Sequence, residues 1–229
     1  MHNTNTVPRH VGIILDGNRR WAKKRGISTQ AGHKAGFKTF RTIADASLER
    51  GIAYLTVYAF STENWHRAKD EVTFLIAYAQ IVIKKYISEL NKKNVRFMWL
   101  GSEHDLPIAL IKSLRTAEEK TKQNTAGTLC VCFNYGGQQE IADAAANLAL
   151  LGKPMTVQGI TEHMYGAENV PPIDLLIRTS GEKRISNFML WRAAYSELYF
   201  TDVLWPDFTP ADLDNALIDF ANRKRRYGA

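Results

Sequence analysis

Short apolar runs typical of buried strands alternate along this chain with longer segments of helical periodicity. The strand-like runs lie at residues 10–15, 53–60, 95–100, 128–134 and 173–178, with a shorter candidate at 198–200. The helical patterns lie at residues 33–50, 69–93, 107–123 and 138–151. Strands that alternate with helices favour a parallel sheet covered on both faces. The sequence therefore predicts an α/β fold with a mostly parallel central sheet of about six strands flanked by helices.

The length of 229 residues fits a single domain over residues 1–229. Residues 152–172 are rich in glycine and proline, yet no repeat or linker divides the chain. The chain shows no signal peptide and no apolar run long enough to span a bilayer. We therefore expect a cytoplasmic protein, which can still act peripherally at a membrane surface.

The net charge of +7 and the pI of about 9.4 point to an anionic partner. Nucleic acid, phosphorylated small molecules and anionic lipid head groups all qualify. The chain has no RRM, KH or helix-turn-helix signature, so we expect no nucleic-acid partner. The short basic run at residues 223–226 is interpreted as a solvated helix end.

The two cysteines, Cys130 and Cys132, lie two residues apart on one predicted strand. Two cysteines on one strand have poor geometry for a disulfide, and they have no partners for a zinc site. We expect both to be small buried apolar residues.

The strongest chemical signal is the segment at residues 10–21. A buried strand ends there at Asp16. The turn residues Gly17 and Asn18 follow, and after them come the two cations Arg19 and Arg20. Open α/β sheets bind ligands beyond the carboxyl ends of their strands. A carboxylate beside cations at that place suits a metal ion held against a phosphate.

A second polar cluster follows the strand at 53–60 and contains Ser61, Asn64 and Arg67. Ser61 and Asn64 offer neutral hydrogen-bonding groups, and Arg67 offers a guanidinium for phosphate. Alternatively, Ser61 caps a short turn and Asn64 is simply solvated.

A third polar cluster follows the strand at 173–178. Arg178 ends this strand, and a glycine-bearing loop leads to Arg184 and Ser186. The sequence predicts that Ser186 opens a helix over residues 188–194. Two arginines beside a helix start would form a diphosphate cradle.

Three further features each allow two interpretations. Glu197 is either paired with an arginine near the core edge or a second metal ligand. His33 is either structural or a phosphate donor. The long helical pattern at 69–93 either packs in the core or forms one wall of an elongated apolar cavity.

The chain has no nucleophile elbow, no GxxxxGK[ST] loop and no GxGxxG motif. The sequence therefore provides no motif for nucleophilic hydrolysis or for nucleotide-dependent phosphoryl transfer.

Taken together, these clusters resemble the cis-prenyltransferases, most closely the undecaprenyl diphosphate synthase type. The matching segments are residues 10–21, 32–36, 58–67, 134–137, 174–188 and 191–208. The resemblance implies a homodimeric, mostly parallel α/β fold. It implies Mg²⁺-dependent condensation of isopentenyl diphosphate with an allylic diphosphate, farnesyl or shorter. The implied product is a cis-polyprenyl diphosphate, undecaprenyl diphosphate for a cell-wall lipid carrier, which can partition to the membrane.

The resemblance also implies residue roles. Asp16 and Asn64 would be catalytic, and Asp16 and Glu197 would hold Mg²⁺. The allylic diphosphate would be bound by Gly17, Asn18, Arg19, Arg20 and His33. The isopentenyl diphosphate would be bound by Arg67, Arg178, Arg184 and Ser186. The remaining implied substrate-binding residues are Trp21, Thr29, Ser61, Thr62, Glu63, Trp65 and Ile185.

One departure from the family pattern concerns Thr29, which stands where an arginine is usual. Loss of a charged hydrogen bond would cost about 1.5–3 kcal/mol of allylic diphosphate binding if nothing replaces it. Lys34 and Arg25 are the candidates to compensate. Short-chain or branched-product enzymes of the same family stay open as alternatives. A non-catalytic partner subunit is a further alternative, although such a subunit need not keep Asp16, Asn64 and Arg184.

Overall fold

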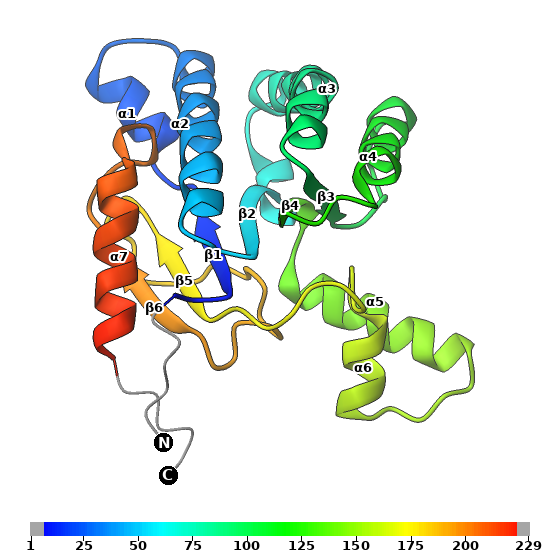
Figure 1. Cartoon of the computed structure of the whole chain (residues 1–229). Helices are drawn as coiled ribbons and strands as arrows, with labels where there is room; N and C mark the ends of the chain where they lie inside the picture. Colours follow the sequence, from blue (N-terminus) through cyan, green and yellow to red (C-terminus); the bar gives the residue numbers. More distant parts are fainter. Residues whose placement is uncertain (1–6, 224–229) are drawn as a thin grey trace.

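Six strands form one all-parallel sheet in the computed structural model, which describes residues 7–223 of the chain (Figure 1). The strands are β1 His10–Ile14, β2 Tyr54–Ser61, β3 Val95–Leu100, β4 Gly127–Tyr135, β5 Leu175–Arg178 and β6 Glu197–Phe200. They lie in the order β3-β4-β2-β1-β5-β6, and every adjacent pair is parallel. The predicted fold class is confirmed, and each predicted strand is present within a few residues of its expected bounds.

The helices confirm the four helical patterns and add three helices that were not predicted. The α-helices are α1 Asn18–Lys24, α2 Thr29–Glu49, α3 Lys69–Lys92, α4 Ile108–Thr121, α5 Gly137–Leu150, α6 Val157–His163 and α7 Pro210–Asn222. Two 3-10 helices are η1 Thr62–His66 and η2 Trp205–Asp207. Helix α2 starts earlier than its apolar pattern because the hydroxyl of Ser28 accepts a hydrogen bond from the Ala31 N–H. Sequence reasoning missed α1, α6 and α7.

The predicted helix over residues 188–194 was wrong, because this described segment forms turns. Ser186, Asn187 and Met189 have φ angles of 46°, 63° and 48°. These left-handed conformations exclude a right-handed helix. The apolar side chains that suggested a helix, Phe188 and Met189, are instead fully buried against the sheet. A helix N-terminus is therefore not part of the phosphate cradle.

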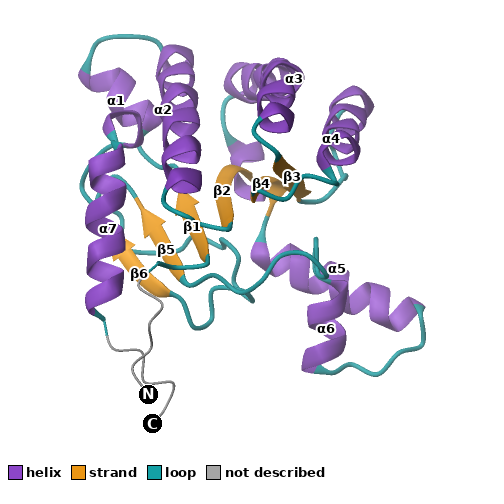
Figure 2. Ribbon diagram, in the orientation of Figure 1, coloured by secondary structure: helices purple, strands orange, loops and turns teal. Residues whose placement is uncertain are grey.

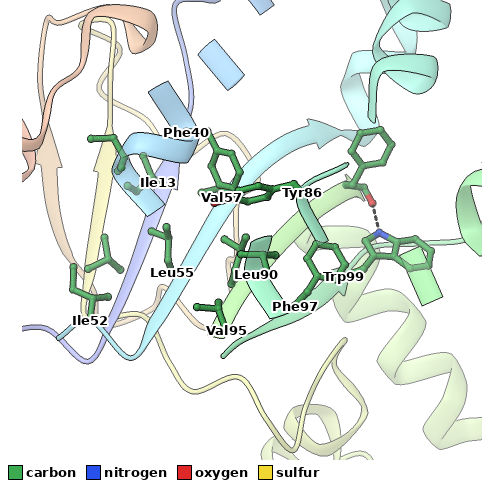
Figure 3. Close-up of a cluster of buried hydrophobic side chains, with 14 of the residues drawn as sticks. Ile13, Phe40, Ile52, Leu55, Val57, Tyr86, Leu90, Val95, Phe97 and Trp99 are labelled. Carbon is green, nitrogen blue, oxygen red and sulfur yellow. Dashed lines mark hydrogen bonds between the residues drawn. The ribbon is translucent and has the colours of Figure 1, made fainter. Parts of the chain in front are cut away.

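Two apolar layers cover the sheet because successive strand residues point to opposite faces. On one face, Ile13, Leu55 and Val57 pack with Phe40 of α2 and Leu90 of α3 (Figure 3). Figures 1 and 2 show α2, α3 and α4 along this side of the sheet, while α5 and α6 pack together away from them.

The opposite face holds the two cysteines. Cys130 and Cys132 are free thiols and lie in the apolar cluster with Ile14, Phe188 and Met189. Burial raises the pKa of the Cys130 thiol to about 12. Both thiols are therefore inert packing groups, as predicted.

None of the helices in the described residues combines the length and the apolar content that a bilayer span requires. At the carboxyl terminus, Arg223 follows α7 and pairs with Glu197 and Asp219. The other members of the basic run, Lys224, Arg225 and Arg226, lie outside the described residues.

Candidate active site

A cavity of about 1210 Å³ begins at the carboxyl ends of β1, β2 and β5 and extends between α2 and α3. Its polar end gathers thirteen of the predicted site residues, Asp16, Gly17, Asn18, Arg19, Arg20, Thr29, His33, Ser61, Glu63, Asn64, Arg67, Arg178 and Ser186. Helix α3 begins near this end, after β2 and η1, and leads back to the start of β3. The depth of the cavity is apolar and is lined by Leu75, Ala79, Ile83, Leu90, Phe97, Leu114 and Leu129. Phe40, Val57, Tyr86 and Leu90 in Figure 3 belong to this lining.

Asp16 is held at the polar end by two arginines. Its Oδ2 atom accepts hydrogen bonds from Arg178 Nη2 at 3.0 Å and from Arg20 Nη2 at 3.3 Å. Burial raises the pKa of Asp16, but the hydrogen bond from Arg178 and the charges of both arginines outweigh it. The pKa of this carboxyl therefore lies below its ordinary value. Asp16 is ionised at neutral pH.

Arg178 organises the loop that follows β5. Its Nη1 atom donates to the Ser186 hydroxyl at 2.7 Å and to the Arg184 carbonyl at 2.5 Å. The Arg184 side chain points elsewhere: it is 62% exposed, pairs with Glu182 and does not line the cavity. The structure thus brings the side chains of Arg178 and Ser186 together, whereas Arg184 contacts Arg178 through its backbone carbonyl.

Close packing of α1 on α2 places the residues after Asp16. A Cβ atom at Gly36 would lie 2.1 Å from Asn18 Oδ1, and one at Gly32 would lie 2.4 Å from the Asn18 carbonyl oxygen. Gly17, with a φ of 118°, caps α1 where the chain passes the backbone of Trp205. The glycines therefore let the Asp16 loop sit against α2, which carries His33.

Glu71, at the start of α3, contacts three of the predicted substrate-binding residues. Its Oε1 atom lies 3.1 Å from His33 Nε2 and accepts from Arg67 Nη1 at 3.0 Å. Its Oε2 atom lies 3.7 Å from Arg19 Nε. Glu71 is 8% exposed. Sequence reasoning missed it, and the only available signal was its i,i+4 spacing from Arg67.

Burial lowers the pKa of His33, and the hydrogen bond and charge of Glu71 offset this only in part. The positive charges of Arg67 and Arg19 lower the pKa further. The net pKa of His33 lies below its ordinary value, so the imidazole is neutral at pH 7.

The 3-10 helix η1 carries the second polar cluster into the cavity. The Ser61 N–H donates to Asn64 Oδ1 at 3.3 Å, so Ser61 does cap a short turn, and both residues also line the cavity. Glu63 Oε1 accepts a hydrogen bond from Asn187 Nδ2 at 2.9 Å. Burial raises the pKa of Glu63, but this bond and others at η1 more than offset it. Asn187 lines the cavity and was not predicted.

Five predicted substrate-binding residues do not line the cavity, Trp21, Thr62, Trp65, Arg184 and Ile185. The Trp21 indole donates to Asp207 at 2.7 Å. The Trp65 indole donates to Asn134 at 2.7 Å. Thr62 lies where a Cβ atom added to Gly136 would be 2.6 Å from its hydroxyl, and Ile185 packs on the apolar cluster of the far sheet face.

Thr29 lines the cavity, but its two candidate substitutes do not. Arg25 pairs with Asp207 and stacks over Trp21, with 4.1 Å between the guanidinium carbon and the ring centre. Lys34 lies near the Phe74 ring. Lys23 of α1 does line the cavity, although the sequence did not indicate it as a substitute.

Glu197 lies at the opposite end of the sheet from Asp16. It is the first residue of β6 and pairs in register with Leu175, whereas Asp16 follows Ile14, which pairs with Arg178. Asp16 is thus five residues further along the strand direction, or roughly 16 Å at 3.3 Å per residue. Glu197 accepts from Arg223 at 2.8 Å. Within one chain the two carboxylates do not share an ion, and Glu197 has the structural role that the sequence left open.

The comparisons with known proteins identify the family of the chain. The Prenyltransf family model, which describes undecaprenyl diphosphate synthases, matches residues 14–228. Isoprenyl transferase 2 of Corynebacterium glutamicum is 44% identical over 230 residues, covering 97% of this chain and 94% of that protein. The trans,polycis-polyprenyl diphosphate synthase of Thermobifida fusca, specific for (2Z,6E)-farnesyl diphosphate, is 46% identical, covering 97% of this chain and 81% of that protein.

A solved structure shows the same arrangement of the chain. Lavandulyl diphosphate synthase from Lavandula x intermedia, in complex with dimethylallyl diphosphate, superposes with a TM-score of 0.93 at 34% identity. The match covers 98% of this chain and 100% of that chain. The family model and the curated relatives both span nearly the full length of the chain. The chain therefore belongs to the undecaprenyl diphosphate synthase family of isoprenyl transferases and is a prenyltransferase.

Proposed function

We propose that this enzyme condenses isopentenyl diphosphate with an allylic diphosphate, farnesyl or shorter, and elongates it to a cis-polyprenyl diphosphate. The observation that carries the proposal is one continuous cavity with a cationic end and an apolar depth. The cationic end suits two diphosphates, and the depth suits a growing hydrocarbon chain. The size of the cavity favours a long product, of which undecaprenyl diphosphate is our candidate.

The charges at the polar end fit two anionic substrates. Each diphosphate carries roughly two to three negative charges near neutral pH, so two of them repel when side by side. Arg19, Arg20 and Arg67 line the cavity with Arg178 and relieve that repulsion. We assign the allylic diphosphate to the loop at residues 17–20 and His33. We assign the isopentenyl diphosphate to Arg67, Arg178 and Ser186.

In the proposed reaction, the bond between allylic C1 and its diphosphate oxygen breaks, and the electron pair leaves with the diphosphate. The isopentenyl double bond attacks C1, forming the new carbon–carbon bond. A proton is then lost from isopentenyl C2, which creates the new double bond. Arg20 and Arg178 stabilise the charge that develops on the leaving group. Asn64, oriented by the Ser61 N–H, is our candidate to receive the departing proton.

The residues at the polar end fit a magnesium ion held jointly with substrate. No group of three or more His, Cys, Asp or Glu side chains within residues 7–223 forms a metal cage. Mg²⁺ commonly binds one or two carboxylates and completes its shell with substrate phosphates and water. Asp16, half-buried and ionised, would supply that carboxylate. When bound, Mg²⁺ would neutralise diphosphate charge and favour departure of the leaving group.

We also propose that the enzyme works as a homodimer. β6 is an edge strand; Leu198 within it is 38% exposed, and Tyr195 just before it is 77% exposed. An edge strand with exposed apolar side chains favours association with a second copy. Light scattering is expected to give twice the chain mass of 25.9 kDa, and Leu198→Arg is expected to lower that mass. A single-chain mass for the unmodified protein would contradict the dimer.

Allylic diphosphate binding is expected to take up a proton at His33. The pKa of His33 lies below its ordinary value in the free enzyme, and a neighbouring diphosphate favours the protonated form. The affinity for the allylic diphosphate should therefore rise as the pH falls from the pKa of His33 in the complex toward its lower pKa in the free enzyme. Calorimetry in buffers of different ionisation enthalpy measures the uptake. His33→Gln is the control, because the diphosphate itself titrates at a pKa of about 6. Equal proton uptake by both proteins would contradict the role of His33.

The condensation is tested by incubating the pure enzyme with labelled isopentenyl diphosphate and a series of allylic diphosphates. We expect label to enter a butanol-soluble product with at least one starter, and chelation of Mg²⁺ by EDTA to stop it. Since the product carries an apolar tail, it should partition into added vesicles. No incorporation with any starter would favour the non-catalytic partner subunit.

A further inference from the structure

The segment at residues 134–137 resembles the family pattern, yet the proposed reaction gives its first residue no role. Asn134 lies near the end of β4, is 3% exposed and does not line the cavity. Its φ of 53° is left-handed, a conformation that asparagine and glycine tolerate better than other residues. The backbone conformation at position 134 therefore favours asparagine or glycine.

All hydrogen-bonding groups of the Asn134 carboxamide are used. Its Oδ1 atom accepts from the Trp65 indole at 2.7 Å. Its Nδ2 atom donates to the Ser102 carbonyl at 2.9 Å and to the His104 carbonyl at 2.7 Å. Asn134 thus joins η1 to the loop that follows β3.

Trp65 links Asn134 to η1 through the indole hydrogen bond. Its ring packs edge-on against Phe60, with 5.3 Å between ring centres. η1 has five residues, too few for a 3-10 helix to hold its own position. It nevertheless carries Asn64 into the cavity and is followed directly by Arg67. The placement of these two residues therefore depends on side-chain anchors such as Trp65.

We propose that Asn134 is a positioning residue that fixes Asn64 and Arg67 through the Trp65 indole. The proposal rests on the proposed function, because those two residues matter through the condensation. Asn134 does not line the cavity, so it acts only through the hydrogen bond to Trp65 and the loop bonds that hold its own carboxamide.

The test compares Asn134→Gly with Trp65→Phe. Glycine keeps the left-handed backbone and removes the carboxamide. Phenylalanine keeps an aromatic ring against Phe60 and removes the indole N–H. A matched control is Asn94→Gly at the opposite end of β3. Asn94 also has a left-handed φ, of 55°, and its carboxamide also makes paired hydrogen bonds, at 3.0 and 3.1 Å to Thr125.

Both site variants are expected to lower kcat at least about tenfold, and the double variant no further than the stronger single variant. KM for isopentenyl diphosphate should rise less than kcat falls. Asn94→Gly should leave kcat unchanged. Equal kcat for Asn134→Gly and Asn94→Gly would overturn the proposal, as would additive losses in the double variant.

Amide hydrogen exchange separates this proposal from the proposed function. Exchange at residues 61–67 should be at least about tenfold faster in Asn134→Gly and Trp65→Phe than in the unmodified enzyme or Asn94→Gly. Unchanged exchange there would overturn the positioning role even in an active enzyme. Absence of condensation by the unmodified enzyme would instead overturn the proposed function, while the exchange result still decides whether Asn134 holds η1.

Discussion

Asp16→Ala is expected to lower the turnover of the condensation by a factor on the order of 10² to 10³. The carboxylate orients Arg20 and Arg178 and is the candidate ligand for Mg²⁺. Its removal takes away that ligand and leaves the Arg178 guanidinium, which is 5% exposed, without its charge partner. Steady-state incorporation of labelled isopentenyl diphosphate measures the effect.

Two controls separate this loss of turnover from a loss of fold. Circular dichroism and thermal melting should show Asp16→Ala folded, because Arg178 keeps its hydrogen bonds to Ser186 and to the Arg184 carbonyl. Asp16→Asn keeps the size of the side chain and one acceptor but loses the charge. We expect it to be nearly as inactive as the alanine variant. A folded Asp16→Ala enzyme that retains more than a tenth of normal turnover would show that Asp16 is not essential.

Ala79→Trp is expected to shorten the product without stopping the first condensation. Ala79 lines the cavity on α3, between the lining residues Leu75 and Ile83. A tryptophan there would fill the depth of the cavity while leaving the polar end intact. The growing chain would then meet the indole after fewer additions. Thin-layer or mass-spectrometric sizing of the dephosphorylated products measures the change.

The matched control is Ala77→Trp, the same substitution on the same helix at an exposed position. It should leave product length unchanged. Ile76 supplies a second comparison, because it is half-buried on α3 but packs on the core and does not line the cavity. Trimming Leu75 to alanine should alter the product distribution, whereas trimming Ile76 should not. Identical products from Ala79→Trp and Ala77→Trp would contradict the cavity as the place of chain growth.

The meeting of the polar clusters was predictable because the sheet is parallel. Asp16, Ser61 and Arg178 each stand at or beyond the carboxyl end of a strand, and β2, β1 and β5 are neighbours. Alternation of strand and helix patterns was enough to place these ends at one edge. Glu197 stands at the start of β6, as the predicted strand at 198–200 implies, and its assignment as a metal ligand rested only on the family resemblance.

Which side chains turn into the cavity was less predictable. Arg178 ends β5 and Arg184 lies in the loop that follows, yet Arg178 is buried beside Asp16 whereas the Arg184 side chain is exposed. Trp65 adjoins Asn64 yet points away from the cavity to Asn134. The turn at residues 186–189 resembles a helix in composition, and the left-handed conformations at Ser186, Asn187 and Met189 exclude one.

Glu71 shows a different limit of sequence reasoning. Its pairing with His33 spans 38 residues and links α2 to α3. An acidic residue in the first turn of a helix is already explained by its favourable interaction with the helix dipole. Nothing in the sequence therefore indicates that Glu71 contacts His33 as well. Long-range contacts between one acid and several cations depend on how helices pack, and no spacing rule in the sequence reveals them.

The most direct measurement is a crystal structure of the enzyme with Mg²⁺ and an unreactive thio-analogue of farnesyl diphosphate. The account predicts the diphosphate within hydrogen-bonding distance of the loop at residues 17–20, with Mg²⁺ on Asp16. It predicts the hydrocarbon tail between α2 and α3, directed past Ala79 toward Leu129. A diphosphate bound away from Asp16, or a tail directed out of the cavity into solvent, would contradict the account.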